Sequence, residues 1–276
     1  MAGVTTPDAP RPDDLLALAL EAARAATRLL VDERPADLRV TAKSSPTDPV
    51  TEMDRASERL VVETVRAARP GDGFFGEEGS DSAGTTGVVW VVDPIDGTVN
   101  YLYGLPHWSV SIAAEVDGTV VAGVVAAPVL GETFVATQGG GAFVERADGS
   151  RRRLQVTEDV PLERALVGTG FGYAAERRAA QGAVLARLLP QVRDIRRNGS
   201  AALDLCDLAA GRLDAYYERG VNRWDTAAAA LVAREAGARV GGLRGEPDSP
   251  QLTAAAAPAL FERLVEVLAG LGADAG

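Results

Sequence analysis

Histidine and cysteine are nearly absent from this chain, and their scarcity excludes several kinds of site. Among 276 residues there is one cysteine, Cys206, and one histidine, His107. A structural zinc site needs about four Cys or His ligands, so this chain cannot build one. A catalytic triad would have to use His107, which has no nucleophile motif beside it. We interpret His107 as structural or surface-exposed and Cys206, within the helical pattern AALDLCDLAAG, as a core residue.

Long apolar runs and an excess of positive charge are also missing. No window approaches the ~18 unbroken apolar residues that a membrane helix needs. The net charge of −11 argues against nucleic acid as a main ligand, because phosphate backbones bind basic surfaces. A phosphorylated small molecule is compatible with this charge if a metal cation mediates the contact.

The N-terminal stretch MAGVTTPDAPRPDD lacks a basic region followed by an apolar run, so it does not match a signal peptide. We expect residues 1–12 to form a disordered leader, because prolines and acids bury little surface. A cytoplasmic location is the default expectation.

Helix signals dominate the next part of the chain. The first helix is expected to end near Val31 and to use Asp13 or Asp14 as its N-cap. Thr51 and Asp54 resemble a capping box that opens a second helix, stopped by the following Pro-Gly pair. The first half therefore begins with two helices.

Strand-like runs follow, and the pattern changes in the second half. Asp117-Gly118 between the first two of these runs is a strong hairpin signal, so the sheet should be largely antiparallel. Residues 146–162 are charged and irregular and suit a domain junction. Beyond them strands and helices alternate. We expect an N-terminal α+β domain over residues 13–155 and a C-terminal α/β domain over residues 156–276.

Carboxylates follow the apolar run VVWVV, which predicts a buried strand. Asp93 and Asp96 stand directly after it in DPIDGT. Other acids stand near the ends of predicted elements: Asp54, Glu77, Glu78, Glu218 and Asp225. Each motif alone has an ordinary explanation as a turn, a solvated loop or a helix N-terminus. Together, these acids would repel one another without cations, and oxygen-only ligands suit hard divalent ions, chiefly Mg²⁺. The N-terminal domain would then be the metal-site domain.

The DPIDGT turn has features that suit phosphate chemistry. Pro94 fixes its backbone φ, and the carbonyl of Ile95 can point at an ion. Gly97 permits close approach of the backbone, and the N–H groups of Gly97 and Thr98 could hold phosphate oxygens at a helix start. Metal ions with amide donors and a hydroxyl predict transfer of a phosphoryl group to water.

These segments resemble the signatures of the inositol monophosphatase family, closest to its bacterial inositol-1-phosphatase branch. The matching segments are GEE at 76–78, WVVDPIDGTVN at 90–100, WDTAAA at 224–229, AKSSPTDPVTEMD at 42–54 and RRNGSAALDLCDLAAGRLDAYYE at 196–218. The resemblance implies a mixed α/β fold, the layered αβαβα sandwich of the sugar-phosphatase type, and a homodimer.

The resemblance also implies a ligand set for two to three Mg²⁺ ions. Glu77, Asp93 and the Ile95 carbonyl should hold the first ion, and Asp93, Asp96 and Asp225 the second. A third, weaker ion would lie near Glu77.

Catalytic roles follow from the same resemblance. A water on the first ion, polarised by Glu77 and by Thr98 with its partner Asp54, would attack phosphorus in line. Gly97 and Thr98 would hold phosphate oxygens, and the second ion would stabilise the leaving alkoxide. Lys43 belongs to the mobile loop that closes over the third ion.

Substrate contacts are implied as well. Glu218, Ala201 and Asp96 would contact the polyol hydroxyls, with Gly199 and Ser200 nearby. The expected activity is Mg²⁺-dependent hydrolysis of inositol 1-phosphate to myo-inositol and phosphate.

The sequence leaves three other substrates as alternatives for the same fold and chemistry: fructose 1,6-bisphosphate, histidinol phosphate and 3′-phosphoadenosine nucleotides. Glu218 favours a neutral polyol, whereas an adenine nucleotide would need an aromatic or basic platform that the sequence does not identify. The segment GTGFG at 168–172 fails as a dinucleotide fingerprint and is interpreted as a strand-to-helix turn. Asn222-Arg223 precedes the WD motif at a place where the family varies, so the sequence does not decide which leaving group the pocket accepts.

Two other classes of function compete with this one. In an aspartyl-phosphate hydrolase Asp93 itself would attack phosphorus, but that class spaces its acids two apart, not three with a proline between them. A regulatory protein could use the same fold to bind protein or RNA. Retention of Glu77, Asp93, Asp96 and Asp225 argues against that as the sole role, because mutually repelling acids serve no purpose in a retired enzyme.

Overall fold

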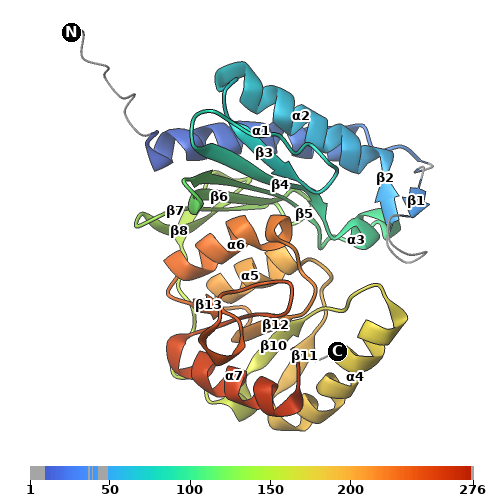
Figure 1. Cartoon of the computed structure of the whole chain (residues 1–276), viewed down its shortest axis with the longest axis vertical. Helices are drawn as coiled ribbons and strands as arrows, with labels where there is room; N and C mark the ends of the chain where they lie inside the picture. The colour runs from blue at the N-terminus through green and yellow to red at the C-terminus, as the bar shows by residue number, and fades with distance from the viewer. Residues whose placement is uncertain (1–9, 37, 39, 43–48, 275–276) are drawn as a thin grey trace.

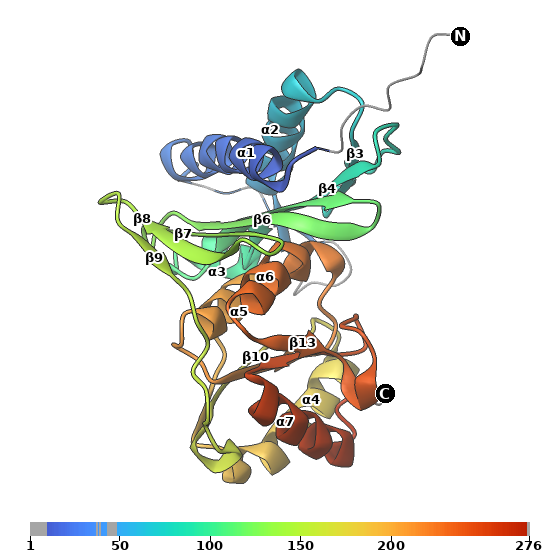
Figure 2. The same ribbon diagram turned by 90° about the vertical axis from the view of Figure 1, so that its left-hand side faces the viewer.

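The computed structural model describes residues 10–36, 38, 40–42 and 49–274, and these form five layers of alternating helices and sheets (Figure 1). From one end to the other the layers are α1 with α2, a seven-stranded sheet, α5 with α6, a five-stranded sheet, and α4 with α7 (Figure 2). The fold is thus the mixed αβαβα sandwich that the family resemblance implies.

The first sheet fills the N-terminal half, with strand order β3-β4-β5-β6-β7-β8-β9. Its strands are β3 (Gly73–Gly76), β4 (Val88–Asp96), β5 (Ser109–Val116), β6 (Thr119–Ala127), β7 (Glu132–Thr137), β8 (Gly141–Arg146) and β9 (Arg151–Arg153). All neighbours are antiparallel except β3 and β4. Asp117 and Gly118 have φ of 50° and 80°, the paired positive values of a two-residue hairpin turn, so that prediction is confirmed.

Helices α1 (Pro12–Asp32) and α2 (Glu52–Ala68) pack together, and α1 crosses the outer face of β5, β6 and β7. The predicted capping box is present: the Thr51 hydroxyl accepts from the Asp54 N–H, and the Asp54 carboxylate accepts from the Thr51 N–H. The N-cap predicted for α1 is wrong. The helix begins at Pro12, whose fixed φ suits the first helical position, and Asp13 and Asp14 lie in the first turn.

The second sheet has the order β11-β10-β12-β14-β13. Its strands are β10 (Leu166–Thr169), β11 (Asp194–Arg196), β12 (Ala215–Glu218), β13 (Arg239–Gly241) and β14 (Thr253–Ala256). The helices of this half are α4 (Ala175–Leu188), α5 (Ala201–Ala209), α6 (Arg223–Glu235) and α7 (Pro258–Leu271). The alternation predicted for this half is confirmed, and GTGFG spans the end of β10 and the start of the predicted turn to α4.

Short elements escaped the sequence analysis. Residues 146–162 were expected to be irregular, but β9 pairs with β8 and extends the first sheet to Arg153. Its three arginines are exposed, so no apolar alternation marks the strand. Strands β1 (Val40–Ala42) and β2 (Pro49–Thr51) form a separate antiparallel pair, and the six-residue helix α3 (Thr98–Tyr103) follows β4. The boundary expected near residue 155 stays a prediction.

Helix α5 is the centre of the molecule, between the two sheets. Nearly all its residues are buried, which explains an apolar surface that runs around the whole helix. Cys206 is buried there as a free thiol, as predicted. Among the described residues, no helix combines the length and apolar character needed to cross a bilayer.

Candidate active site

The end of β4 is distorted so that two of its acids face the same region. Asp93 pairs with Ser111 and Asp96 with Ser109, which leaves one extra residue on β4 and makes a β-bulge. Pro94 lies within this bulge, where a missing backbone donor does no harm. The Asp93 carboxylate accepts from the Ile95 N–H at 3.0 Å, which tightens the turn.

The N-terminus of α5 binds Asp96. The Ser200 hydroxyl donates to Asp96 at 2.5 Å, and the Ala202 N–H donates to the same oxygen at 2.7 Å. Ser200 is also the N-cap of α5, because its hydroxyl accepts from the Leu203 N–H. Asp96 thus bridges a strand of the first sheet and a helix of the second half.

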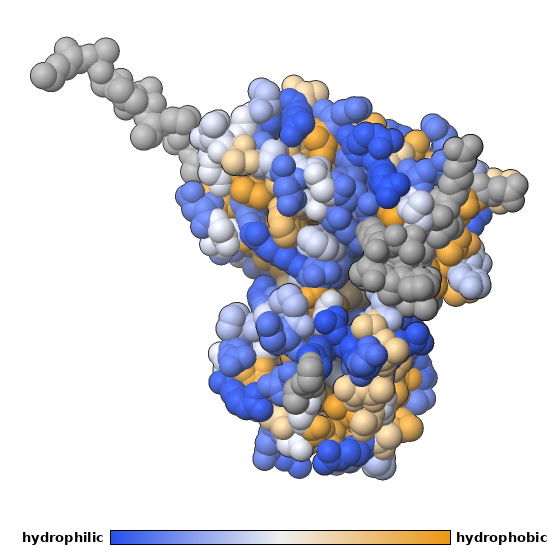
Figure 3. All heavy atoms as spheres, turned by 45° about the vertical axis from the view of Figure 1, so that its right-hand side comes forward, coloured by the Kyte–Doolittle hydropathy of each residue, from blue (hydrophilic) through white to orange (hydrophobic). Residues whose placement is uncertain are grey.

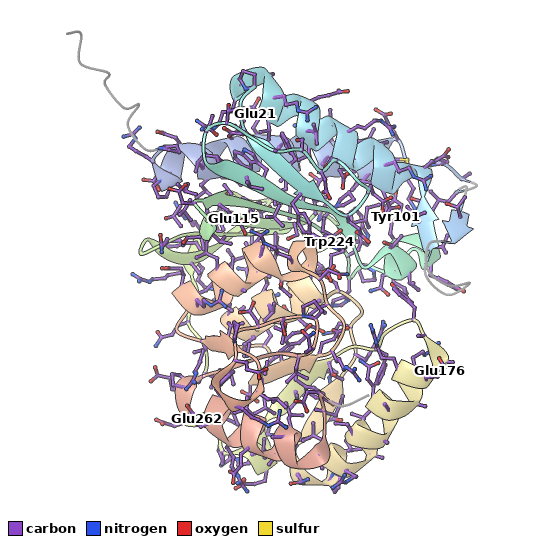
Figure 4. All side chains as sticks on the ribbon, viewed as in Figure 1. Glu21, Tyr101, Glu115, Glu176, Trp224 and Glu262 are labelled. Carbon is purple, nitrogen blue, oxygen red and sulfur yellow. The ribbon has the colours of Figure 1, made fainter. Side chains whose placement is uncertain are left out.

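Helix α6 supplies the third acid from its first turn. The Asp225 carboxylate accepts from the Asn222 N–H at 2.5 Å, in a capping box. Trp224 beside it packs against Phe75, with ring centroids 5.3 Å apart, and Arg223 forms an ion pair with Glu115. Figure 4 shows Trp224 where α6 approaches the first sheet. These contacts fix the orientation of Asp225.

Three carboxylates converge at this point. Oxygens of Asp93, Asp96 and Asp225 all lie within 4.8 Å of one another. Glu77 follows β3, and its N–H donates to the Val92 carbonyl at 3.2 Å, which sets it beside the end of β4. The Glu77 carboxylate lines the same pocket as Asp93, and after burial its charge is the largest cause that raises the pKa of Asp93. Four of the predicted acids therefore form one cluster.

Thr98 and Asp54 form a second unit beside this cluster. The Thr98 hydroxyl lies 3.2 Å from Asp54 Oδ1 and 3.1 Å from the Ile95 carbonyl. Both side chains are buried, and Asp54 is held by the N–H and hydroxyl of Thr51 at 2.8 and 2.5 Å. This network brings α2 to the turn that follows β4.

Gly97 allows the close approach of three segments here. Its φ of 93° is left-handed, and a Cβ at this position would lie 2.9 Å from the His107 carbonyl and 3.0 Å from the Gly199 carbonyl. Asn100, on α3, donates to the His107 and Asn198 carbonyls at 2.5 and 2.8 Å. His107 thus contributes its backbone, not its ring, to this region.

One pocket of about 420 Å³ contains the cluster, within the size range of small-molecule sites. Its walls include Gly97, Thr98, Gly199, Ala201 and Glu218. The Glu218 carboxylate accepts from the Tyr216 hydroxyl at 3.0 Å. The pocket therefore brings together the acids and the predicted substrate-side residues. Ser200 lies behind it, on Asp96.

The acids of the pocket resist ionisation in the absence of a cation. Burial, then the neighbouring carboxylates, raises the pKa of Asp93 and Asp225 well above the usual range. Burial also raises the pKa of Asp54 and of Asp96 to about 6, although their hydrogen bonds oppose the rise. The pKa of Glu218 rises to about 7 for the same reason.

This donor set fits a hard divalent cation. It offers only oxygen ligands, and its acids carry pKa values that burial, then mutual repulsion, raises; a bound cation would oppose both effects. Residues Glu77, Asp93, Asp96 and Asp225, with the Ile95 carbonyl at the same pocket wall, could hold it.

Comparison with known proteins identifies the family. The model of the inositol monophosphatase family matches residues 11–272. The chain belongs to this family. The inositol-1-monophosphatase of Mycobacterium leprae is 51% identical over 237 residues, which cover 83% of this chain and 81% of that protein. The protein is accordingly an inositol phosphate phosphatase.

Two further relatives of the family extend the comparison. The solved structure of Mycobacterium tuberculosis SuhB has a TM-score of 0.80 and 43% identity, covering 95% of this chain and 98% of that one. A Pasteurella multocida relative carries the name Nus factor SuhB, with 42% identity over 82% of this chain and 84% of that protein. The family thus includes proteins with two kinds of name.

Lys43 of the predicted loop lies outside the described residues, as do most of the residues of the predicted leader. The sequence analysis also missed a set of residues that line the pocket. They are Phe171, Tyr173, Arg177, Arg197 and Arg219. The sequence analysis did not name these residues individually, because they reach the pocket from the turn before α4, from the first turn of α4 and from the loops before α5 and α6.

Proposed function

We propose that this protein hydrolyses inositol 1-phosphate to myo-inositol and phosphate in a reaction that depends on Mg²⁺. The observation that carries the proposal is the convergence of Asp93, Asp96 and Asp225 within 4.8 Å at a pocket that also contains Glu218. Such a cluster needs a cation, and its oxygen-only ligands favour Mg²⁺. Two or three ions are expected.

Different residues of the pocket would bind the metal ions and the phosphate group during phosphoryl transfer. Mg²⁺, when bound, would neutralise the acids, polarise the phosphoryl group and make water a better nucleophile. Asp93, Asp96 and Asp225 would hold the ions, with Glu77 and the Ile95 carbonyl. The N–H groups of Gly97 and Thr98 would bind oxygens of the phosphate.

Glu77, Thr98 and Asp54 would activate the attacking water. The new bond joins the water oxygen to phosphorus, and the bond between phosphorus and the inositol oxygen breaks. The proton leaves the water towards Glu77 or the Thr98–Asp54 pair, and the inositol oxygen takes a proton from solvent. The 3.2 Å contact between Thr98 and Asp54 supports this assignment.

Glu218 would select a polyol. A carboxylate held by the Tyr216 hydroxyl keeps lone pairs free to accept hydrogen bonds from ring hydroxyls. Ala201 and Gly199, beside the start of α5, would complete the contacts to the ring, and Ser200 would support them from behind the pocket through its hydrogen bond to Asp96. Fructose 1,6-bisphosphate, histidinol phosphate and 3′-phosphoadenosine nucleotides stay as alternative substrates of the same chemistry.

A solely regulatory role is less well supported. One relative's name, Nus factor SuhB, suggests such a role for that protein. A binding protein has no need for the buried acid cluster, which strains the fold when no cation is present. A homodimer and a cytoplasmic location stay predictions, and light scattering after size exclusion would test the first.

Phosphate release with and without Mg²⁺ tests the proposal. The substrates are inositol 1-phosphate, fructose 1,6-bisphosphate, histidinol phosphate and 3′-phosphoadenosine 5′-phosphate, assayed side by side. We expect Mg²⁺-dependent turnover that is fastest on inositol 1-phosphate. If another substrate were hydrolysed fastest, the proposed reaction would be retained and the proposed substrate replaced. No turnover on any of the four would refute the proposal.

A further inference from the structure

Gln181 is a buried amide in the middle of α4, and its side chain contacts two separate segments of the pocket wall. It is 9% exposed. Its Oε1 accepts from the Gly172 N–H at 2.9 Å, and its Nε2 donates to the Arg219 carbonyl at 3.2 Å. The Gly170 carbonyl lies 3.5 Å from the same nitrogen. One side chain thus bridges the turn before α4 and the loop before α6.

The two segments that Gln181 bridges form much of the pocket. Residues 170–174 line it from the turn before α4, and residues 218–222 line it from the end of β12 and the loop before α6. All of them except Glu218 lie outside helices and strands. Regular secondary structure therefore does not set the separation of the two segments. Figure 3 shows hydrophilic residues along the waist between the two halves, where a ring rich in hydroxyl groups would find polar contacts.

The contacts of Gln181 begin where the pairing of the sheet ends. Strands β10 and β12 are paired as far as Thr169 opposite Tyr217, which immediately precede Gly170 and Glu218. Beyond that point the Gln181 amide connects the two chains. The side chain thus extends the connection between β10 and β12 into the pocket wall.

Gly170 transmits this connection to the substrate-facing acid. A Cβ on Gly170 would lie 2.2 Å from both oxygens of Glu218, so the backbone of the turn packs directly against that carboxylate. The Tyr216 hydroxyl donates to the same carboxylate at 3.0 Å. A small displacement of the turn would therefore change the space in which the Glu218 carboxylate lies.

The space beneath the two segments leaves little room for solvent to replace the amide. A cavity of about 20 Å³ remains there, with Gln181, Val184 and Leu252 in its lining. This volume suits about one water molecule. An apolar side chain in place of Gln181 would leave the Gly172 N–H and the Arg219 carbonyl without their partner, which destabilises the arrangement of the two segments.

We propose that Gln181 is a positioning residue for substrate selection, because its amide holds the two segments at the separation that places Glu218 against the ring hydroxyls. This inference rests on the proposed function, which assigns recognition of the ring to Glu218. Among the described residues, the hydrogen bonds of the Gln181 side chain go only to these two segments. Reaction at phosphorus should therefore tolerate its loss, whereas binding of the ring should not.

Two substrates separate this role from a general loss of structure. Inositol 1-phosphate carries ring hydroxyls for Glu218 to bind, whereas p-nitrophenyl phosphate carries none. Gln181→Met removes both hydrogen-bonding groups at similar length, and Gln181→Glu keeps the acceptor for Gly172 but places a second oxygen against the Arg219 carbonyl. Gln191→Leu is the control, because it removes an exposed amide from the turn after α4, outside the pocket.

We expect Gln181→Met to raise KM for inositol 1-phosphate by about tenfold or more, with kcat within about threefold of the native value. On p-nitrophenyl phosphate, kcat/KM should stay within about threefold, because that substrate does not use Glu218. Gln181→Glu should show the same difference between the substrates. Gln191→Leu should leave both substrates unchanged.

Two results would overturn the inference alone. Equal losses on both substrates would mean that Gln181 only supports the fold, and an unchanged KM for inositol 1-phosphate would mean that its amide does not position Glu218. In both cases Mg²⁺-dependent turnover of inositol 1-phosphate by the native enzyme would still support the proposed function. Gln181→Glu decides the question if Gln181→Met does not fold. Native turnover of neither substrate, or of p-nitrophenyl phosphate alone, would refute the proposed function and this inference with it.

Discussion

Asp93 makes contact with most of the groups around it in the acid cluster. Burial, then the charges of Glu77, Asp96 and Asp225, raises its pKa, and its carboxylate accepts from the Ile95 N–H at 3.0 Å. It is also 1% exposed, so its charge has little access to water. A cation bound between these acids would depend on it more directly than on any residue at the rim of the pocket.

Replacement of Asp93 by Asn should therefore abolish most of the activity while it stabilises the metal-free fold. We expect kcat/KM on inositol 1-phosphate to fall by at least about 10²-fold, because the amide removes a charged ligand. The free energy of unfolding without Mg²⁺ should rise, since one mutually repelling acid is gone. Phosphate release and urea denaturation measure the two effects.

Asp32→Asn is the matched control, because Asp32 is exposed at the end of α1, away from the pocket. It should change neither activity nor stability in EDTA. If Asp93→Asn kept activity within about tenfold of the native enzyme, the acid cluster would not be the metal-binding site that its chemistry suggests.

The sequence predicted that the acids lie in the pocket, but it did not predict this for the arginines. Asp93, Asp96 and Glu77 stand next to strands whose apolar runs are visible, so convergence at strand ends could be predicted. Arg177 lies in the first turn of α4 and Arg197 in the loop before α5, and their positions depend on glycines that are distant in the chain or ordinary in a turn. No local pattern marks such packing, and the sequence analysis missed both.

At the scale of elements, α3 connects the two halves of the molecule through Asn100. Its side-chain amide donates to the carbonyls of His107, before β5, and Asn198, before α5. Asn198 in turn donates to the buried Asp204 of α5 at 2.7 Å. The turn that carries Asp96 and Gly97 is thus held against the start of α5.

Asn100→Ala should loosen this connection. We expect a loss of about 1–3 kcal/mol in the free energy of unfolding, because two part-buried carbonyls lose their donors. The activity should fall with a larger change in kcat than in KM, since the Asp96–Gly97 turn would no longer be fixed against α5. Tyr103→Ala, at a residue 75% exposed on the same short helix, is the control. Equal effects of the two variants would contradict the role given to Asn100.

The capping box of α2 allows a separate test of how the start of this helix positions Asp54. Thr51→Ala removes the hydroxyl that caps the helix and that donates to Asp54 at 2.5 Å. It should cost about 1–2 kcal/mol of stability and reduce activity, since Asp54 holds Thr98. Thr51→Ser should restore both, because it keeps the hydroxyl. Failure of serine to do so would assign the effect to the threonine methyl group. Thermal denaturation and phosphate release measure the outcome.

The elements themselves were visible in the sequence where their signals are local. The Thr51 capping box, the Asp117-Gly118 hairpin and the apolar run of β4 each depend on a few adjacent residues. Strand β9 was missed because its exposed arginines carry no apolar alternation, and it exists only by pairing with β8. Pairing partners are a property of the whole sheet.

At the scale of the whole molecule, the acid cluster joins the N-terminal half to the C-terminal half. Asp93 and Asp96 come from the first sheet, and Asp225 comes from α6, which packs against that sheet from the other half. Repulsion among these acids therefore acts across the contact between the halves. A divalent cation would convert that repulsion into an attraction, so metal binding should stabilise the entire fold.

The stability of the metal-free protein should fall as pH rises, and Mg²⁺ should suppress that fall. The pKa of Asp54 and of Asp96 is raised to about 6 and that of Glu218 to about 7, so the folded state binds more protons than the unfolded state. The stability from these protons is fully present below the unfolded pKa of each group and is lost as pH rises from about 4 to about 7. Saturating Mg²⁺ should add about 3 kcal/mol at 100 times its Kd, or roughly 5–10 °C in Tm. Thermal denaturation in EDTA and in Mg²⁺ between pH 5 and 8 measures both. A metal-free Tm that rises with pH would contradict the raised pKa values of these buried acids, and no shift with Mg²⁺ at pH 7.5 would contradict the cation site.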